Sequence, residues 1–125
     1  MKPLPLAFVV ISTVALLIGT IWGLCMAVAM DRTMSPAHGQ LNLVGWVTGA
    51  IYGLTYHAVP GAADTGLARL HFIVQLFATA AMPAGMALAI SGAGEMLAGI
   101  GAAAALISAT LFLVNVLTNG CRLGA

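Results

Sequence analysis

Long apolar runs, separated by short connections rich in proline, glycine and charged residues, make up most of this chain. Each run is close to the roughly 20 residues that a helix needs to cross the ~30 Å hydrocarbon layer of a membrane. The predicted helices cover about residues 5–30, 38–59, 68–91 and 97–118. Because the connections are short, consecutive helices are expected to be antiparallel neighbours. The pattern predicts an all-α integral membrane protein, in which residues 1–125 form a single transmembrane domain folded as a four-helix up-down bundle.

The start of the second predicted helix has its own signal. Ser35 followed by Pro36 is typical of an N-cap residue with a proline in the first helical turn. This signal places the beginning of the helix just before His38.

The composition leaves little material for a water-soluble surface. Of the 125 residues, 62% are hydrophobic and 6% are charged, whereas a soluble domain has about 25% charged residues. The lipid bilayer is therefore the expected partner of its surface. The four basic residues are scattered along the chain and form no patch for phosphates, so a nucleic-acid partner is not expected. Cys25 and Cys121 stand far apart in the sequence and are predicted to be free thiols.

The distribution of basic residues predicts the orientation in the membrane. Lys2, Arg69 and Arg122 fall on the side of the N-terminus, the second connection and the C-terminus, and only Arg32 falls on the opposite side. Because cytoplasmic segments carry the excess of lysine and arginine, both termini are predicted to be cytoplasmic. His38 then lies near the outer face of the membrane.

A stripe of polar and small residues follows one face of the second predicted helix. At 100° per residue its members are His38, Asn42, Gly45, Gly49, Tyr52, Gly53 and Tyr56. A neutral imidazole is a natural ligand for heme iron, and a glycine track beside it leaves room for a flat macrocycle. The other interpretation is a glycine ridge for close helix packing, with His38 reaching the lipid headgroups. Both interpretations stay open at this point.

Two stretches of this helix resemble a known family. Residues 36–46, PAHGQLNLVGW, and 51–60, IYGLTYHAVP, are similar to the second helix of the catalytic subunit of the heme-copper oxidase superfamily, in its nitric oxide reductase and cbb3-like branches. The resemblance continues more weakly over about two thirds of the chain, through Gly19, Trp22 and Gly23 and into residues 67–72.

The resemblance implies a b-type heme protein of a bacterial inner membrane. It makes His38 the axial metal ligand, with the remaining pocket formed by Asn42, Gly45, Trp46, Gly49 and Tyr52. Electron transfer, or the handling of heme or of a diatomic gas, is the function expected from such a site.

The departures from the family limit this expectation. Family members have many more helices, and their other heme and copper ligands lie on helices that this chain lacks, so a complete oxidase or nitric oxide reductase site is absent from the single chain. Whether the protein is an enzyme is left open. A second axial ligand from another copy implies a homo-oligomer, and a redox partner or a quinone is a further possibility. The alternative is a cofactor-free structural or assembly protein of the membrane.

Sulfur-containing residues near the end of the first predicted helix suggest copper as another cofactor. Met26, Met30 and Met34 recur every four residues, and with Cys25 they offer soft ligands for Cu(I). The helix is expected to end near Asp31, which would interrupt this spacing.

Polar residues also gather at the start of the third predicted helix. His71 and Gln75 share one face, with His57, Asp64 and Arg69 nearby in the sequence. A proton-uptake mouth or a quinone site would use such residues. Their place at the membrane interface favours a hydrated connection, whose side chains reach the headgroups.

Overall fold

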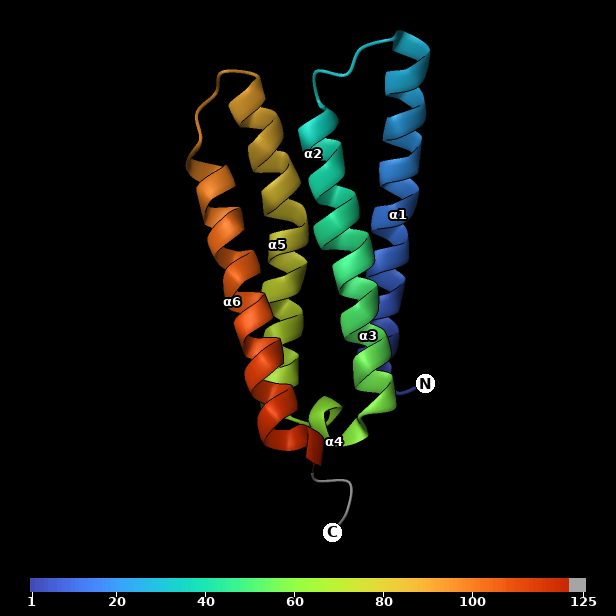
Figure 1. The fold of residues 1–125 in the computed structure, drawn as a ribbon, viewed down its shortest axis with the longest axis vertical. Helices are drawn as coiled ribbons and strands as arrows, with labels where there is room; N and C mark the ends of the chain where they lie inside the picture. The colour runs from blue at the N-terminus through green and yellow to red at the C-terminus, as the bar shows by residue number, and fades with distance from the viewer. Residues whose placement is uncertain (122–125) are drawn as a thin grey trace.

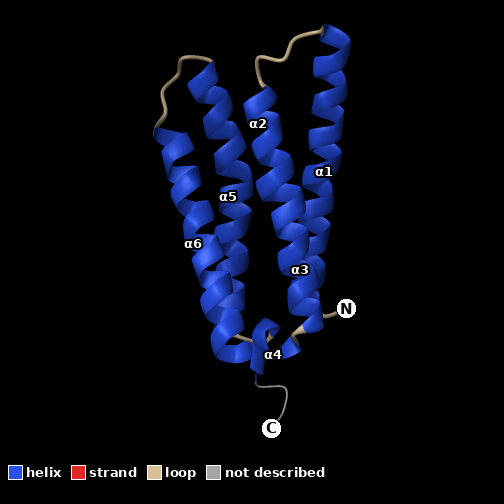
Figure 2. Ribbon diagram, in the orientation of Figure 1, coloured by secondary structure: helices blue, strands red, loops and turns tan. Residues whose placement is uncertain are grey.

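Helices make up the architecture of residues 1–121, the part of the chain that this computed structural model describes. Figure 1 shows long helical columns side by side, and Figure 2 shows the short loops that join them. The columns are α1 (Pro3–Ala29), a second column that begins at Ser35, α5 (Gly66–Ile90) and α6 (Met96–Asn119). Residues 1–121 contain no strand, so the predicted all-α class is confirmed.

The two ends of the columns differ in what they carry. α1 begins and α6 ends at one end, beside the short helix α4 (Pro60–Ala63) (Figure 1). We call this the terminal end, and we call the opposite end, with the connections 30–34 and 91–95, the loop end. At the terminal end Lys2 forms an ion pair with Asp64. Both side chains are exposed, so this pair stabilises the fold by no more than about 1 kcal/mol.

The second column consists of three consecutive segments, α2 (Ser35–Gln40), η1 (Leu41–Thr48) and α3 (Gly49–Ala58). η1 is a π-helix, whose wider turns pair residues five apart. Ser35 is the first helical residue of α2, and no side chain caps this helix. The predicted N-cap at Ser35 is therefore wrong, because Ser35 and Pro36 both lie inside the first turn of α2. Proline is tolerated there, since an N–H in the first turn has no hydrogen-bond partner within the helix.

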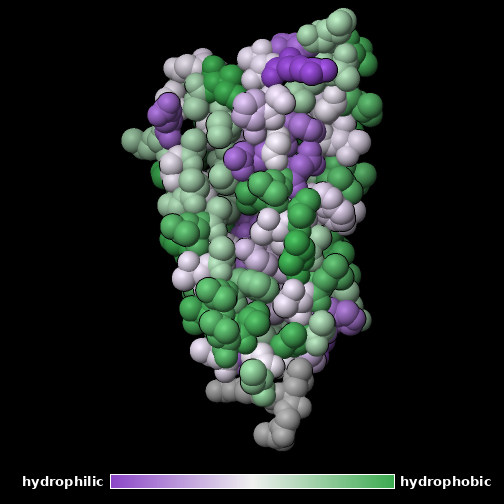
Figure 3. Space-filling view, viewed as in Figure 1, coloured by the Kyte–Doolittle hydropathy of each residue, from purple (hydrophilic) through white to green (hydrophobic). Residues whose placement is uncertain are grey.

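Three helices, α1, α5 and α6, are long and apolar enough to cross a membrane. The second column does not reach this length in any one segment, since the π-helix divides it. Large apolar side chains point outward, among them Ile21 at 61% and Leu106 at 70% exposure. Figure 3 shows hydrophobic residues along much of the visible face and hydrophilic residues gathered mainly toward the loop end. These features are those of a membrane protein.

Glycines of the second column face α1. A Cβ added at Gly45 would come 2.9 Å from the Cβ of Ala15, and one added at Gly53 would come 2.9 Å from the Cβ of Phe8. A Cβ at Gly49 would meet the hydroxyl of Ser12. The glycine face is therefore covered by α1 within one chain, which is the packing interpretation of this stripe.

α5 and α6 approach each other even more closely. A Cβ added at Gly101 would lie 2.7 Å from the Cα of Met82, and one added at Gly85 would lie 2.6 Å from the Cα of Ala98. These are contacts with backbone, which cannot move aside as a flexible side chain does. Gly85 and Gly101 thus serve packing between α5 and α6 inside the chain.

A pair of glycines on α6 tests this packing. We expect Gly101→Ala to lower the free energy of unfolding by about 1–3 kcal/mol, because the added methyl overpacks a backbone contact. Gly99→Ala is the matched control: a Cβ there meets nothing within 4 Å, and the gain in helix propensity is the same at both positions. Unfolding in mixed detergent micelles, followed by circular dichroism, measures both. Equal stability of the two variants would contradict the close approach of α5 and α6.

Candidate functional site

His38 lies between α1 and the second column, near the loop end. Its ring is half-buried, and a Cβ added at Gly23 of α1 would lie 3.1 Å from its Cε1 atom. The side-chain amide of Asn42 lies 3.2 Å from Nε2 and 3.5 Å from Nδ1 of the ring. Trp22 of α1 meets the ring edge-on, with the ring centroids 6.3 Å apart. The sequence prediction named Trp46 for this pocket, whereas the structure places Trp22 beside the imidazole.

This arrangement does not fit a heme in one chain. An axial ligand needs one ring nitrogen aimed at open space as wide as a porphyrin, but Asn42 faces both nitrogens of His38. Gly45 and Gly49, which were predicted to make room for the macrocycle, are covered by Ala15 and Ser12. Heme binding at His38 stays a prediction from the resemblance, and it requires the imidazole to leave its place against Gly23.

Tyr52, the last residue of the predicted pocket, belongs to a different cluster. It is buried near the terminal end, with its ring 4.6 Å from that of His71 and 4.5 Å from that of Phe112. His38 and Tyr52 are separated by most of the second column, about 20 Å at ~1.5 Å per residue. The predicted set of site residues is therefore divided between the two ends of the bundle.

His71 stands at the centre of the cluster near the terminal end. It is fully buried. α5 carries the imidazole, and each of the other three columns places at least one aromatic ring against it. Ring centroids lie 5.2 Å away for Phe8 of α1, 5.6 Å for Tyr56 of α3 and 5.7 Å for Phe112 of α6. Transfer of a polar ring into such surroundings costs several kcal/mol unless its nitrogens are hydrogen-bonded.

Both nitrogens of His71 are hydrogen-bonded, within a chain of buried polar groups. The Tyr56 hydroxyl lies 2.8 Å from Nδ1, and the Ser108 hydroxyl lies 3.0 Å from Nε2. Ser108 donates to Oε1 of Gln75 at 2.7 Å, and Nε2 of Gln75 donates to the Val44 carbonyl at 2.8 Å. On the other side, Nδ2 of Asn115 donates to the Tyr56 hydroxyl at 3.2 Å.

Two backbone carbonyls fix the direction of this chain. A carbonyl oxygen only accepts hydrogen bonds, so the group of Gln75 that faces the Val44 carbonyl must be its NH₂ group. Its Oε1 atom then faces Ser108, whose hydroxyl must donate its one proton to it. His71 consequently donates from Nε2 to Ser108 and accepts from Tyr56 at Nδ1. At the other end, the Ala62 carbonyl accepts from Nδ2 of Asn115 at 2.9 Å, which assigns that amide independently. The two assignments agree, and they select the neutral imidazole with its proton on Nε2.

The chain of hydrogen bonds connects the terminal end to the π-helix. Asn115 also accepts from Thr65 at 3.0 Å and from the half-buried Asn119 at 2.9 Å, which brings it to the terminal surface. At the inner end, Val44 belongs to η1, and Gln75 also reaches the Thr79 hydroxyl at 3.4 Å. Among residues 1–121, no buried side-chain nitrogen or oxygen lacks a partner.

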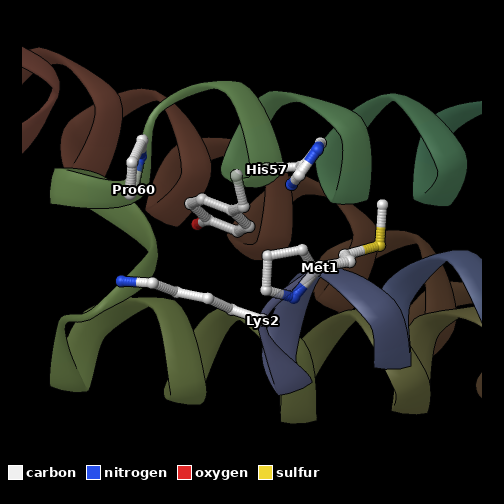
Figure 4. A pocket seen from close by; sticks show the side chains of 6 residues that line it. Met1, Lys2, His57 and Pro60 are labelled. Atoms are coloured by element: carbon white, nitrogen blue, oxygen red, sulfur yellow. The ribbon is translucent and has the colours of Figure 1, made fainter.

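A surface pocket adjoins this chain at the terminal end. Its volume is about 430 Å³, and it is lined by Met1, Lys2, Pro5, Tyr56, His57 and Pro60. Figure 4 shows Lys2 extending along the pocket on the side of Pro60, and Met1 on the side of His57. Tyr56, whose hydroxyl is hydrogen-bonded to Nδ1 of His71, is one of the lining residues, although its side chain is fully buried.

The sequence-based expectation for this region needs correction. A hydrated connection describes His57 and Arg69, which are exposed, but it is wrong for His71, which has no exposed surface. The sequence pattern does not predict Tyr56, Ser108 or Asn115 as partners of this histidine. The sequence signal for Ser108 and Asn115 is weak: they are two polar residues about two turns apart on one face of the mainly apolar helix α6.

Comparisons of the chain with protein-family models, with curated proteins and with solved structures find no match. The resemblance to the heme-copper oxidase superfamily therefore depends on the residues quoted for it, and the chemistry of the site depends on its geometry.

The surroundings of His38 give a direct spectroscopic prediction. We expect the purified protein, after addition of heme, to show no Soret band that depends on His38, because both ring nitrogens face Asn42 in the closed helix interface. Visible spectra of oxidised and dithionite-reduced wild type, His38→Ala and the control Trp46→Phe measure this. A band present in wild type and Trp46→Phe but lost in His38→Ala would overturn the packing role and establish heme binding.

Proposed function

We propose that this chain is a four-span protein of the bacterial inner membrane, with both termini in the cytoplasm, that takes up and holds a proton at His71. The observation that carries the proposal is the one-directional chain of hydrogen bonds from Asn115 to the Val44 carbonyl through a fully buried imidazole. Ionisable groups inside a membrane are costly, and this cost is a reason to assign them a function.

The fourth span in this proposal is the second column. From Ser35 to Ala58 it is about 36 Å long at ~1.5 Å per residue, enough to cross the ~30 Å hydrocarbon layer. The positive-inside rule supports cytoplasmic termini, because Lys2 and Arg69 lie at the terminal end and Arg32 at the loop end. Arg122, which adds to the same count, lies outside the described residues.

The chemistry of uptake follows from the donors. Tyr56 gives its hydroxyl proton to Nδ1 of His71, which leaves an imidazolium and a tyrosinate. A water molecule entering from the adjoining pocket then returns a proton to Tyr56, and this step requires the buried hydroxyl to open to that pocket. The proton on Nε2 then has Ser108 as its acceptor. The amides of Asn115 and Gln75 hold the hydroxyls in orientation, since an amide does not readily pass protons on.

A proton site that opens to one side of the membrane suits a protein that works beside an electron-transferring partner. In this proposal the chain, alone or as a homo-oligomer, supplies or stores protons for such a partner. Electron transfer by a bound heme and the handling of a diatomic gas stay separate predictions from the resemblance.

The relay is tested by nuclear magnetic resonance of protein with ¹⁵N-labelled histidine in lipid. We expect His71 to carry its proton on Nε2, and we expect Tyr56→Phe to slow exchange of that proton with solvent at least about tenfold, because the proton donor at Nδ1 is lost. Phe112→Leu is the control, since Phe112 packs on the imidazole and has no polar group to join the hydrogen-bond chain. A proton on Nδ1 in wild type, or equal exchange in Tyr56→Phe and Phe112→Leu, would rule the relay out.

The orientation is tested with the two native cysteines as starting points. In Cys25→Ser protein, Cys121 is exposed at the terminal end, and an added Ser91→Cys is exposed at the loop end. We expect an impermeant maleimide to label the loop-end cysteine on intact spheroplasts and Cys121 only after lysis. The reverse order would place the termini outside and contradict uptake from the cytoplasm.

A further inference from the structure

The loop end carries a second candidate site, unconnected with the His71 chain. α1 ends there in a left-handed turn, because Met30 has a φ of 52°. The turn is closed by hydrogen bonds from the backbone N–H of Met30 to the Ala27 carbonyl and from that of Asp31 to the Met26 carbonyl, both 3.2 Å. Glycine or asparagine is usual at such a position, so a methionine there is costly in backbone energy.

The turn folds the following residues back over the end of α1. They line a cavity of about 200 Å³ that is open to the surface, together with residues of the last turns of α1: Trp22, Cys25, Met26, Ala29, Asp31 and Met34. Three of these six side chains carry sulfur, in a chain that has two cysteines and seven methionines. Met30 is 90% exposed and does not line the cavity. The turn therefore separates Met30 from the other sulfur-containing residues of the predicted set, and Cys25, Met26 and Met34 line the cavity together.

The chemistry of these groups selects one class of ligand. Thiolate and thioether sulfurs are soft donors, which do not suit Mg²⁺ or Ca²⁺. A thiolate binds Cu(I) and Zn²⁺ alike, and the two thioethers favour Cu(I). An indole face adds attraction for a cation at short range. Asp31 contributes a negative charge at the cavity. Its carboxylate accepts a hydrogen bond from the Thr33 hydroxyl and a second one from the Thr33 backbone N–H, and these bonds hold the pKa of Asp31 below its usual value.

We propose that this cavity binds a soft monovalent cation, Cu(I) or Ag(I), through the thiolate of Cys25 and the thioethers of Met26 and Met34. Binding releases the thiol proton of Cys25 to solvent and leaves the sulfur–metal pair neutral, which suits a site near the membrane surface. The metal keeps its oxidation state. Trp22 lies in the cavity wall, where its indole senses the bound ion.

Competition with a chromophoric Cu(I) chelator, under anaerobic conditions and in detergent, tests the proposal on the whole chain. We expect one Cu(I) per protomer in wild type, and we expect Met34→Leu and Cys25→Ser each to weaken binding at least about tenfold. The matched controls are Met96→Leu, a methionine at the same end that is 81% exposed, and Cys121→Ser, the other thiol. Both controls should bind as wild type does.

A second measurement does not depend on those ligand variants. Ag(I) should quench the fluorescence of Trp22, so quenching persists in Trp46→Phe and disappears in Trp22→Phe. X-ray absorption of the Cu(I)-loaded wild type should show sulfur neighbours only. Retention of Cu(I) by the Cys25→Ser, Met34→Leu double variant, nitrogen or oxygen neighbours in wild type, or stoichiometric binding of Zn²⁺ in its place would overturn the site. None of these outcomes bears on the exchange of the His71 proton, so the two proposals stand or fall separately.

Discussion

The hydrogen bonds of one buried imidazole set the register of this bundle. His71 of α5 is tied to Tyr56 of α3 and to Ser108 of α6, and one turn further along α5, Gln75 is tied to the backbone of η1. Apolar contacts between membrane helices are not directional, and in lipid they have no hydrophobic driving force behind them. A shift of one helix by one residue would leave several of these polar groups unpaired, at a cost of about 1–3 kcal/mol each. The directional bonds therefore select one alignment among many that pack equally well.

Close backbone approach makes these bonds possible. Ser108 reaches His71 because Gly85 and Gly101 bring α5 and α6 into backbone contact, and the glycines of the second column let α1 lie against it. Larger residues at these positions would separate the helices by more than a hydrogen bond allows. The same glycines thus serve packing and polar chemistry together. Their packing role also explains why the face predicted for a macrocycle is covered by α1.

The two ends of the bundle carry different chemistry. Hydroxyl and imidazole groups, with a pocket beside them, lie toward the terminal end, whereas sulfur, indole and carboxylate groups surround a cavity at the loop end. The π-helix lies between them, and its Val44 carbonyl is the last acceptor of the His71 chain. Wide turns of this kind often occur at functional sites, because they make backbone groups available to side chains. In the proposed function and the proposed metal site, each end acts on its own side of the membrane.

The sequence by itself determined the helical class, the membrane character and the approximate extent of each helix, because apolar runs of span length interrupted by proline and glycine have few other outcomes. It also indicated that the glycines of the second helix mark one functional face. It did not determine what covers that face, since a glycine ridge suits a cofactor and a neighbouring helix equally well. Only the tertiary structure decided that Ala15 and Ser12 lie against Gly45 and Gly49 and that Trp22 meets His38. Only it brought together His71, Ser108 and Asn115, because residues dozens of positions apart become hydrogen-bond partners only when the register of the helices is known. Because of the left-handed turn at Met30, this methionine does not line the cavity, whereas Met34 lines it together with Cys25. Helical periodicity cannot predict this arrangement, since it assumes that the helix continues.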